Sequence, residues 1–269
     1  MPLPIQSNLP AQKVGNDLSK LSKRIRGHYE RLSSGRRINS AKDDPAGLAI
    51  STRLRAQLAG YGQATQSASN GLSLASVADA GVGQVSELVG KLKQLSVQSK
   101  NGTLSEQDKQ SLQNEADQVL EQIDQIAGST DFNGISLLDG SVTSVEFDVS
   151  GGNGGGGVSL SLGGANAKSL GLDGFDLDGA GASGALDAAL SQLGGLSAKL
   201  GATSNRLESS SNVLGEQISA LTDAESRIAD ADIAKEQAEL IRDRIRQEAA
   251  LSIGAQANIQ PKNALSLLK

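Results

Sequence analysis

The chain has no cysteine, no tryptophan and a single histidine among its 269 residues. Without cysteine it can form neither a disulfide framework nor a thiolate metal site. One histidine alone does not build a zinc site or supply a catalytic triad, so His28 is interpreted as a residue of a helix seam or interface. We therefore expect no cofactor, no bound metal and no catalytic residue, and a protein that is not an enzyme.

Aromatic residues are also scarce, at 2% of the chain, whereas hydrophobic residues make up 38%. The core must then be built from Leu, Ile, Val and Ala. Such a core suits narrow seams between helices better than a deep ligand pocket.

The charge balance is acidic, with a formal net charge of −5 and a pI near 5.0. This balance argues against nucleic acid or an anionic membrane surface as a partner. No uncharged apolar run approaches the ~18 residues that a bilayer span needs, and the first ten residues lack the pattern of a cleaved secretory signal. Six clustered basic residues are interpreted as a solvated helix face: Lys23, Arg24, Arg26, Arg31, Arg36 and Arg37.

Proline, the strongest helix breaker, is absent between Pro45 and Pro261. Long helices are therefore free to form. We predict a first helix from Pro10 to a glycine cap at Gly35, and a second helix of roughly 50 residues from Pro45, with Asp44 as its N-cap.

A third helix is predicted after a Ser105 cap, and helical patterning resumes near Leu186 and continues with few breaks to about Ile253. Between these helices, residues 131–180 read as a small β region, with a flexible glycine run at 151–157 joining two strands. That run contains G-x-G-x-x-G, but a strand follows it where a dinucleotide site needs a helix N-terminus. The alternating apolar residues are Val145, Phe147 and Val149 in the first strand and Val158, Leu160 and Leu162 in the second.

Both ends of the chain carry apolar residues at heptad spacing, and such seams are sticky unless they are paired. The pattern therefore indicates that the protein assembles, and it indicates this more directly than any chemical activity. The predicted fold is mainly α, a long antiparallel helical rod with coiled-coil terminal helices and a small β-hairpin region in the middle. The predicted assembly seam consists of Val14, Leu18, Leu21, Ile25, Leu32, Leu214, Leu221, Ile228, Ile241 and Ile245.

The most specific string is RLSSGRRINSAKDDPAGLAI at residues 31–50, which closely resembles the N-terminal signature of bacterial flagellins. The segment SRIADAD at 226–232 and the ending from Gln256 to Lys269 resemble the other end of the same family. The residues that carry the signature, and that the resemblance implies as subunit contacts, are Arg31, Leu32, Ile38, Asn39, Asp43 and Asp44. Three residues depart from the usual pattern: His28, Arg36 and Pro45.

The resemblance implies an extracellular subunit of the bacterial flagellar filament, which polymerises with copies of itself. Residues 1–44 with 225–269 would form the inner coiled coil and residues 45–224 the rod, without a large outer domain. It also implies the flagellar export apparatus, an export chaperone, the filament cap and hook-junction proteins as partners. Host innate immune receptors are a further implied partner, through a rod patch that corresponds to Lys91, Leu95 and Glu115.

Two other readings stay open on the sequence. One is the related hook–filament junction protein, which assembles in few copies. The other is an exported surface adhesin that would use the Gly/Asp-rich middle of the chain.

Overall fold

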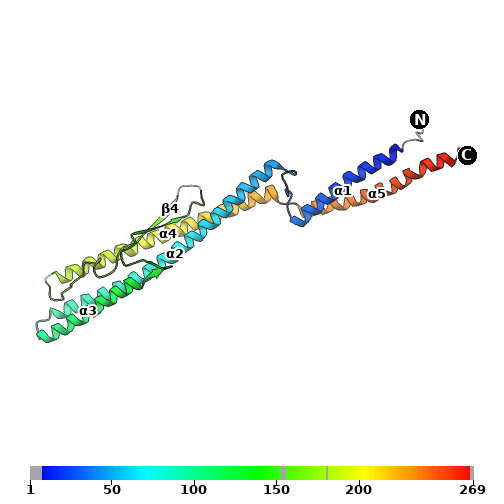
Figure 1. Cartoon of the computed structure of the whole chain (residues 1–269). Coiled ribbons are helices and arrows are strands. Elements are labelled where there is room, and N and C mark those ends of the chain that lie inside the picture. The colour runs from blue at the N-terminus through cyan, green and yellow to red at the C-terminus, as the bar shows by residue number, and fades with distance from the viewer. Residues whose placement is uncertain (1–7, 153–155, 180, 267–269) are drawn as a thin grey trace. The chain divides into compact units, whose positions relative to one another are not determined.

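The computed structural model describes residues 8–152, 156–179 and 181–266, with side chains up to residue 259. Over these residues the chain is mainly α-helical with two small antiparallel sheets, which confirms the predicted fold class (Figure 1). The elements are α1 (Leu9–Ser34), α2 (Pro45–Ser99), α3 (Glu106–Ser129), β1 (Asp131–Phe132), β2 (Ile135–Ser136), β3 (Ser144–Asp148), β4 (Gly157–Ser161), α4 (Ala182–Ala229) and α5 (Ile233–Ser266).

The chain divides into two compact units. Unit 1 contains residues 1–56 and 221–269, and unit 2 contains residues 57–220. The divisions fall inside α2 and α4, 12 residues after the predicted layer boundary at 44/45 and 4 residues before the one at 224/225. The assignment of those layers to an inner coiled coil and an outer rod stays a prediction.

The main hydrophobic core lies in unit 2, where α2, α3 and α4 pack with β4 and the loop that follows it. Leu92, Ile123 and Leu193 from the three helices are almost fully buried. The loop contributes four more buried side chains: Leu170, Leu172, Phe175 and Leu177. Aliphatic side chains supply nearly all of this core, as the shortage of aromatic residues requires.

The helix ends follow the capping residues in the sequence. Gly35 ends α1 in the left-handed conformation, with φ 68°. Asp44 Oδ1 accepts a hydrogen bond from Gly47 N at 2.9 Å at the start of α2, and Ser105 with Asp108 forms a capping box on α3. These three predicted boundaries are confirmed.

The predicted hairpin is the antiparallel pair β3 and β4, in which Val145 faces Leu160 and Phe147 faces Val158. Val158 and Leu160 turn toward the helices and are buried. The predicted glycine loop falls partly outside the described residues, at 153–155. A second, shorter hairpin joins β1 to β2 through Asn133 and Gly134, both at positive φ, as a two-residue hairpin turn requires.

The C-terminal helical stretch differs from its prediction in two respects. It is interrupted at residues 230–232, where the backbone leaves the helix to pair with the segment after α1: Arg37 N donates to Ala229 O, and Ala231 N donates to Gly35 O. It also continues past Ile253 to Ser266, through Pro261. Pro261 removes one backbone N–H donor from this helix, and the helical backbone continues on both sides of it.

Candidate assembly site

In unit 1 the two terminal helices lie side by side, and α1 packs along α5 (Figure 1). Leu21 and Ile25 of α1 form a small core with Leu240 of α5, and Leu32 packs against it. Toward the chain ends, Asn8 Nδ2 donates to Ala257 O at 3.0 Å. The N-terminal part of the predicted seam therefore pairs with the other end of the same chain.

The C-terminal part of the predicted seam is distributed differently. Leu214 is buried in unit 2, and Leu221 and Ile228 are half-buried in unit 1. Ile241 and Ile245 are 57% and 61% exposed, because they lie on the face of α5 that turns away from Leu240. Their role as an assembly seam stays a prediction.

More apolar side chains of α5 are exposed further along the helix. Leu251, Ile253 and Ile259 each leave more than half of their surface in water, at 54%, 58% and 52%. With Ile241 and Ile245 they form the exposed α5 stripe. Burying one such side chain fully is worth about 1.5 to 3 kcal/mol, so the stripe is a candidate contact surface.

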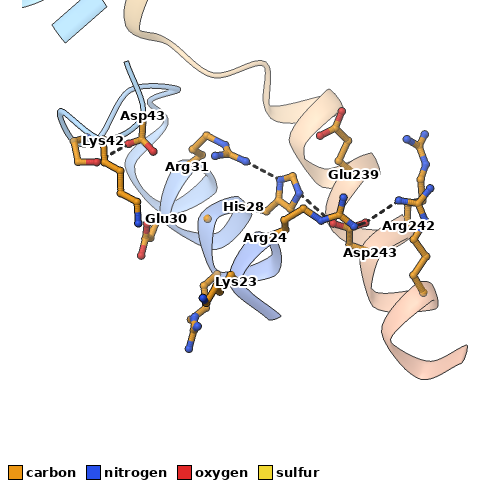
Figure 2. A pocket seen from close by; sticks show the side chains of 14 residues that line it. Lys23, Arg24, His28, Glu30, Arg31, Lys42, Asp43, Glu239, Arg242 and Asp243 are labelled. Carbon is orange, nitrogen blue, oxygen red and sulfur yellow. Dashed lines mark hydrogen bonds and ion pairs between the residues drawn. The ribbon is translucent and has the colours of Figure 1, made fainter. Parts of the chain in front are cut away.

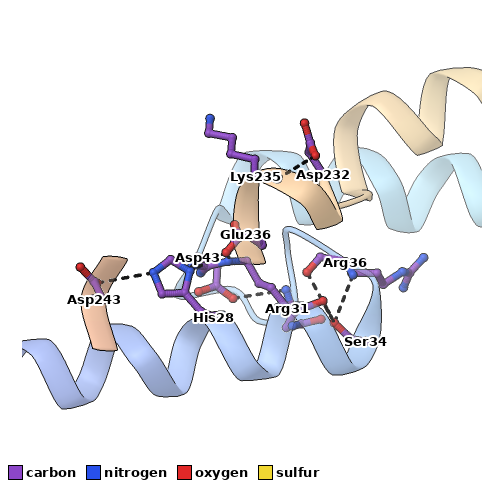
Figure 3. A network of polar contacts seen from close by, with 10 residues as sticks. His28, Arg31, Ser34, Arg36, Asp43, Asp232, Lys235, Glu236 and Asp243 are labelled. Atoms are coloured by element: carbon purple, nitrogen blue, oxygen red, sulfur yellow. Dashed lines mark hydrogen bonds and ion pairs between the residues drawn. The ribbon is translucent and has the colours of Figure 1, made fainter. Parts of the chain in front are cut away.

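A polar cluster interrupts the apolar pairing of α1 and α5 at His28, which is 5% exposed (Figure 3). His28 Nδ1 lies 2.5 Å from Glu236 Oε2, and Nε2 lies 3.7 Å from Asp243 Oδ2. Arg31 Nε donates to Glu236 Oε1 at 2.9 Å, and Arg24 Nη2 donates to Asp243 Oδ1 at 3.1 Å. The expected position of His28 in a helix interface is confirmed.

The environment of Glu236 favours its charged form. Burial raises the pKa of Glu236, but hydrogen bonds from His28 and Arg31 outweigh this effect and hold the pKa below its ordinary value of 4.5. The interpretation of the basic residues as a solvated face is confirmed for Arg24, whose side chain is exposed, but Arg31 and Arg36 are only partly exposed. All three form ion pairs with acids on the C-terminal half of the chain. The partners lie far apart in the sequence, so the sequence pattern did not reveal these ion pairs.

A polar groove of about 830 Å³ opens beside this cluster (Figure 2). Its walls are charged, so it does not resemble a pocket for an apolar ligand. It is lined by residues of α1, the connector before α2, and α5, among them Arg26, His28, Lys42, Glu239 and Arg242.

The connector between α1 and α2 is tied to the end of α4. Glu225 Oε1 accepts from Arg36 Nη2 and from Arg55 Nε, at 2.8 and 2.9 Å. Ile38, at 3% exposed, is the buried apolar residue of this connector. Arg36, which departs from the family pattern, therefore has a defined structural partner.

Asp43 organises the connector from within. Its Oδ2 accepts hydrogen bonds from Asn39 N at 3.2 Å, Ser40 N at 3.0 Å and Ser40 Oγ at 2.9 Å. The Ser40 hydroxyl contributes most to lowering the pKa of Asp43 below its ordinary 3.8, and the two backbone donors add to it. The signature residues Asn39, Asp43 and Asp44 thus hold the turn and cap α2, while Arg31 and Leu32 pack at the α1–α5 interface.

These contacts predict an acid-sensitive connector. A carboxyl with a depressed folded pKa stabilises the fold fully above its unfolded pKa, and this stabilisation is lost as pH falls through the folded pKa. We expect the thermal midpoint to drop less steeply below about pH 4 in Asp43→Asn than in the unchanged chain. Circular dichroism melts at several acidic pH values measure this, and equal slopes for both proteins would contradict it.

The predicted receptor patch lies in unit 2. Lys91 Nζ and Glu115 Oε1 form an ion pair at 2.9 Å, with both side chains about half exposed, whereas Leu95 is 6% exposed and packs in the core. Recognition by host immune receptors stays a prediction. Among the described residues, no helix is both long and apolar enough to cross a membrane.

Sequence reasoning missed the acidic partners Glu225, Glu236 and Asp243. A signal for two of them was available, because Glu236, Leu240 and Asp243 follow the i, i+4, i+7 spacing of one helix face. Acids at apolar seam positions indicate buried polar partners on the facing helix.

Comparisons with known families cover both halves of the chain. Residues 5–143 match the bacterial flagellin N-terminal helical region, and residues 184–268 match the bacterial flagellin C-terminal helical region. Phase 1 flagellin of Salmonella naestved is 38% identical over 175 residues, which cover 65% of this chain and 34% of the relative. The flagellin of Salmonella dublin gives the same values. The chain therefore spans about a third of the length of the curated relatives it matches.

Two solved structures are also similar. Bacillus cereus flagellin aligns with a TM-score of 0.49 and 30% identity, over 55% of this chain and 88% of that one. A flagellar hook-associated protein of Vibrio parahaemolyticus aligns with a TM-score of 0.47 and 16% identity, over 70% of this chain and 97% of that one.

Proposed function

The chain belongs to the bacterial flagellin family, and we propose that it is a structural subunit that polymerises helically into the extracellular flagellar filament. The observation that carries this proposal is the exposed α5 stripe. Five large aliphatic side chains of α5 are more than half exposed, although Leu240 of the same helix is packed against α1.

The stripe supports contacts between copies. An apolar surface of this kind on a chain with few aromatic residues and charged groove walls does not favour a small ligand, and it does favour another helix. A contact between two different surfaces of identical copies generates an open helical polymer when its rotation does not close a ring. Each subunit would then bury its stripe against its neighbours.

The pairing of the chain ends supports different structural roles for the two parts of the subunit. Residues 1–44 and 225–269 would form the inner coiled-coil layer and residues 45–224 the rod, without a large outer domain. Export without a cleaved signal, and contacts with the export apparatus, an export chaperone, the filament cap and hook-junction proteins, are part of the same proposal through the family. The role is structural, with no catalytic step.

Seeded elongation tests the proposal. Purified chain is added to short filament fragments, and negative-stain electron microscopy measures the filament length over time. A filament subunit extends the seeds to many times their length. Capping after a few copies would instead indicate a junction protein, and absence of any addition would contradict a polymerising subunit.

A further inference from the structure

We infer that His28, Glu236 and Glu239 form a binding site for one divalent transition-metal ion of the zinc type, which links α1 to α5. Donor atoms of these three side chains lie within 4.8 Å of one another. Glu236 and Glu239 are three residues apart on α5 and so share a face, and His28 reaches them from α1. This inference goes beyond the proposed function and does not depend on it.

The donor set selects the class of ion. One imidazole nitrogen and two carboxylate oxygens suit Zn²⁺ and the neighbouring divalent metals, whereas Mg²⁺ and Ca²⁺ prefer oxygen alone. Two carboxylates balance the double charge of the ion. Three protein ligands with a water in the fourth position form a complete tetrahedral zinc site.

The surroundings match those of a metal-binding histidine. Such a histidine usually donates its second ring N–H to a carboxylate, which fixes the ring, and the ligating carboxylates are themselves hydrogen-bonded. Here Asp243 Oδ2 lies 3.7 Å from His28 Nε2, on the side of the ring away from Glu236, and Arg31 Nε holds Glu236 Oε1 (Figure 3). Arg24 and Arg246 in turn hold Asp243.

Glu239 provides an independent indication. The Glu236 carboxylate contacts His28 and Arg31, but within the described part of the chain the side chain of Glu239 forms no hydrogen bond and no ion pair. Both His28 and Glu239 line the polar groove, so an ion and its water have a route to the donors (Figure 2). The Glu239 carboxylate lies beside a buried imidazole and an open groove, so it is available to coordinate a metal ion.

Binding of the metal ion replaces contacts that His28 makes in the metal-free protein. The ion takes the lone pair of His28 Nδ1 while the ring keeps its proton on Nε2, facing Asp243. It replaces the contact between His28 Nδ1 and Glu236 Oε2 and displaces Arg31 Nη2 from its position 3.1 Å from His28 Nδ1. Arg31 Nε can keep its bond to Glu236. Since both helices supply ligands, the ion binds the paired state of α1 and α5 and stabilises it.

The test uses the full chain without a histidine tag, so that His28 is its only imidazole. Isothermal titration calorimetry with ZnCl₂ is expected to show one ion bound per chain, and the thermal midpoint is expected to be higher in zinc than in EDTA. Co²⁺ is expected to give visible absorption bands of a tetrahedral site. Absence of zinc binding to the unchanged chain would overturn the inference.

Variants of single acidic residues test which side chains bind the metal ion. Glu239→Gln replaces the carboxylate by an amide of the same size at a side chain that makes no hydrogen bond or ion pair within the described residues. The fold is therefore retained, and zinc binding is expected to be lost together with the Co²⁺ bands. Asp243→Asn is expected to weaken binding by about 10- to 100-fold. Glu248→Gln, an exposed acid on the same helix, is the matched control and should bind zinc unchanged. Equal zinc binding by Glu239→Gln and Glu248→Gln would overturn the site.

Discussion

Replacing Ile241 and Ile245 together by aspartate is expected to abolish filament growth and to leave the monomer folded. Both side chains are more than half exposed, so the folded chain loses little packing. In an assembled interface the same change removes two buried aliphatic side chains, each worth about 1.5 to 3 kcal/mol, and so weakens the contact by roughly 100-fold or more. The buried carboxylates would add a desolvation cost.

Two measurements separate the effects on assembly and on folding. Sedimentation or electron microscopy follows seeded elongation, and circular dichroism compares the helix content and melting of the two monomers. The matched control is the double change of Ile241 and Ile245 to leucine, which keeps the apolar surface and should elongate. Elongation of the aspartate variant at the unchanged rate would show that this part of the exposed α5 stripe faces solvent in the polymer.

Two glycines of α2 are expected to respond in opposite directions to the same substitution. A Cβ on Gly81 would lie 2.6 Å from Leu138 Cδ1 and 2.9 Å from Thr130 Oγ1, whereas a Cβ on Gly83 meets no atom within 4 Å. Gly81→Ala therefore overpacks the core of unit 2 and should cost about 1 to 3 kcal/mol of unfolding free energy. Gly83→Ala should gain up to about 1 kcal/mol, because alanine loses less entropy in a helix.

Urea unfolding of the two variants measures the difference directly. The two positions share one helix and are two residues apart, so each serves as the control for the other. A loss at Gly81 together with a gain at Gly83 would confirm that Gly81 is required for the close approach of Leu138 and Thr130 to α2. Equal stability of the two variants would mean that the core adjusts to the extra methyl group.

Local patterns were sufficient to predict most elements. Gly35, Asp44 and Ser105 act on the backbone within a few residues of themselves, so the ends of α1, α2 and α3 could be read from the chain. The hairpin was equally readable, because its alternation is local. The interruption at residues 230–232 was not, because the backbone there pairs with Gly35 and Arg37, almost two hundred residues earlier in the sequence.

The sequence by itself determined a mainly α-helical chain with apolar seams at both ends and a family signature at residues 31–50, since periodicity, caps and motifs are properties of neighbouring residues. Only the tertiary structure decided which acids meet which bases. His28 lies 208 positions from Glu236, and no local pattern shows that two distant helix faces will meet. Folding also separated the predicted seam into a buried part, at Leu21 and Ile25, and an exposed part, at Ile241 and Ile245. A helix can bury only the face that its partner covers, and the partner is chosen by the fold of the whole chain.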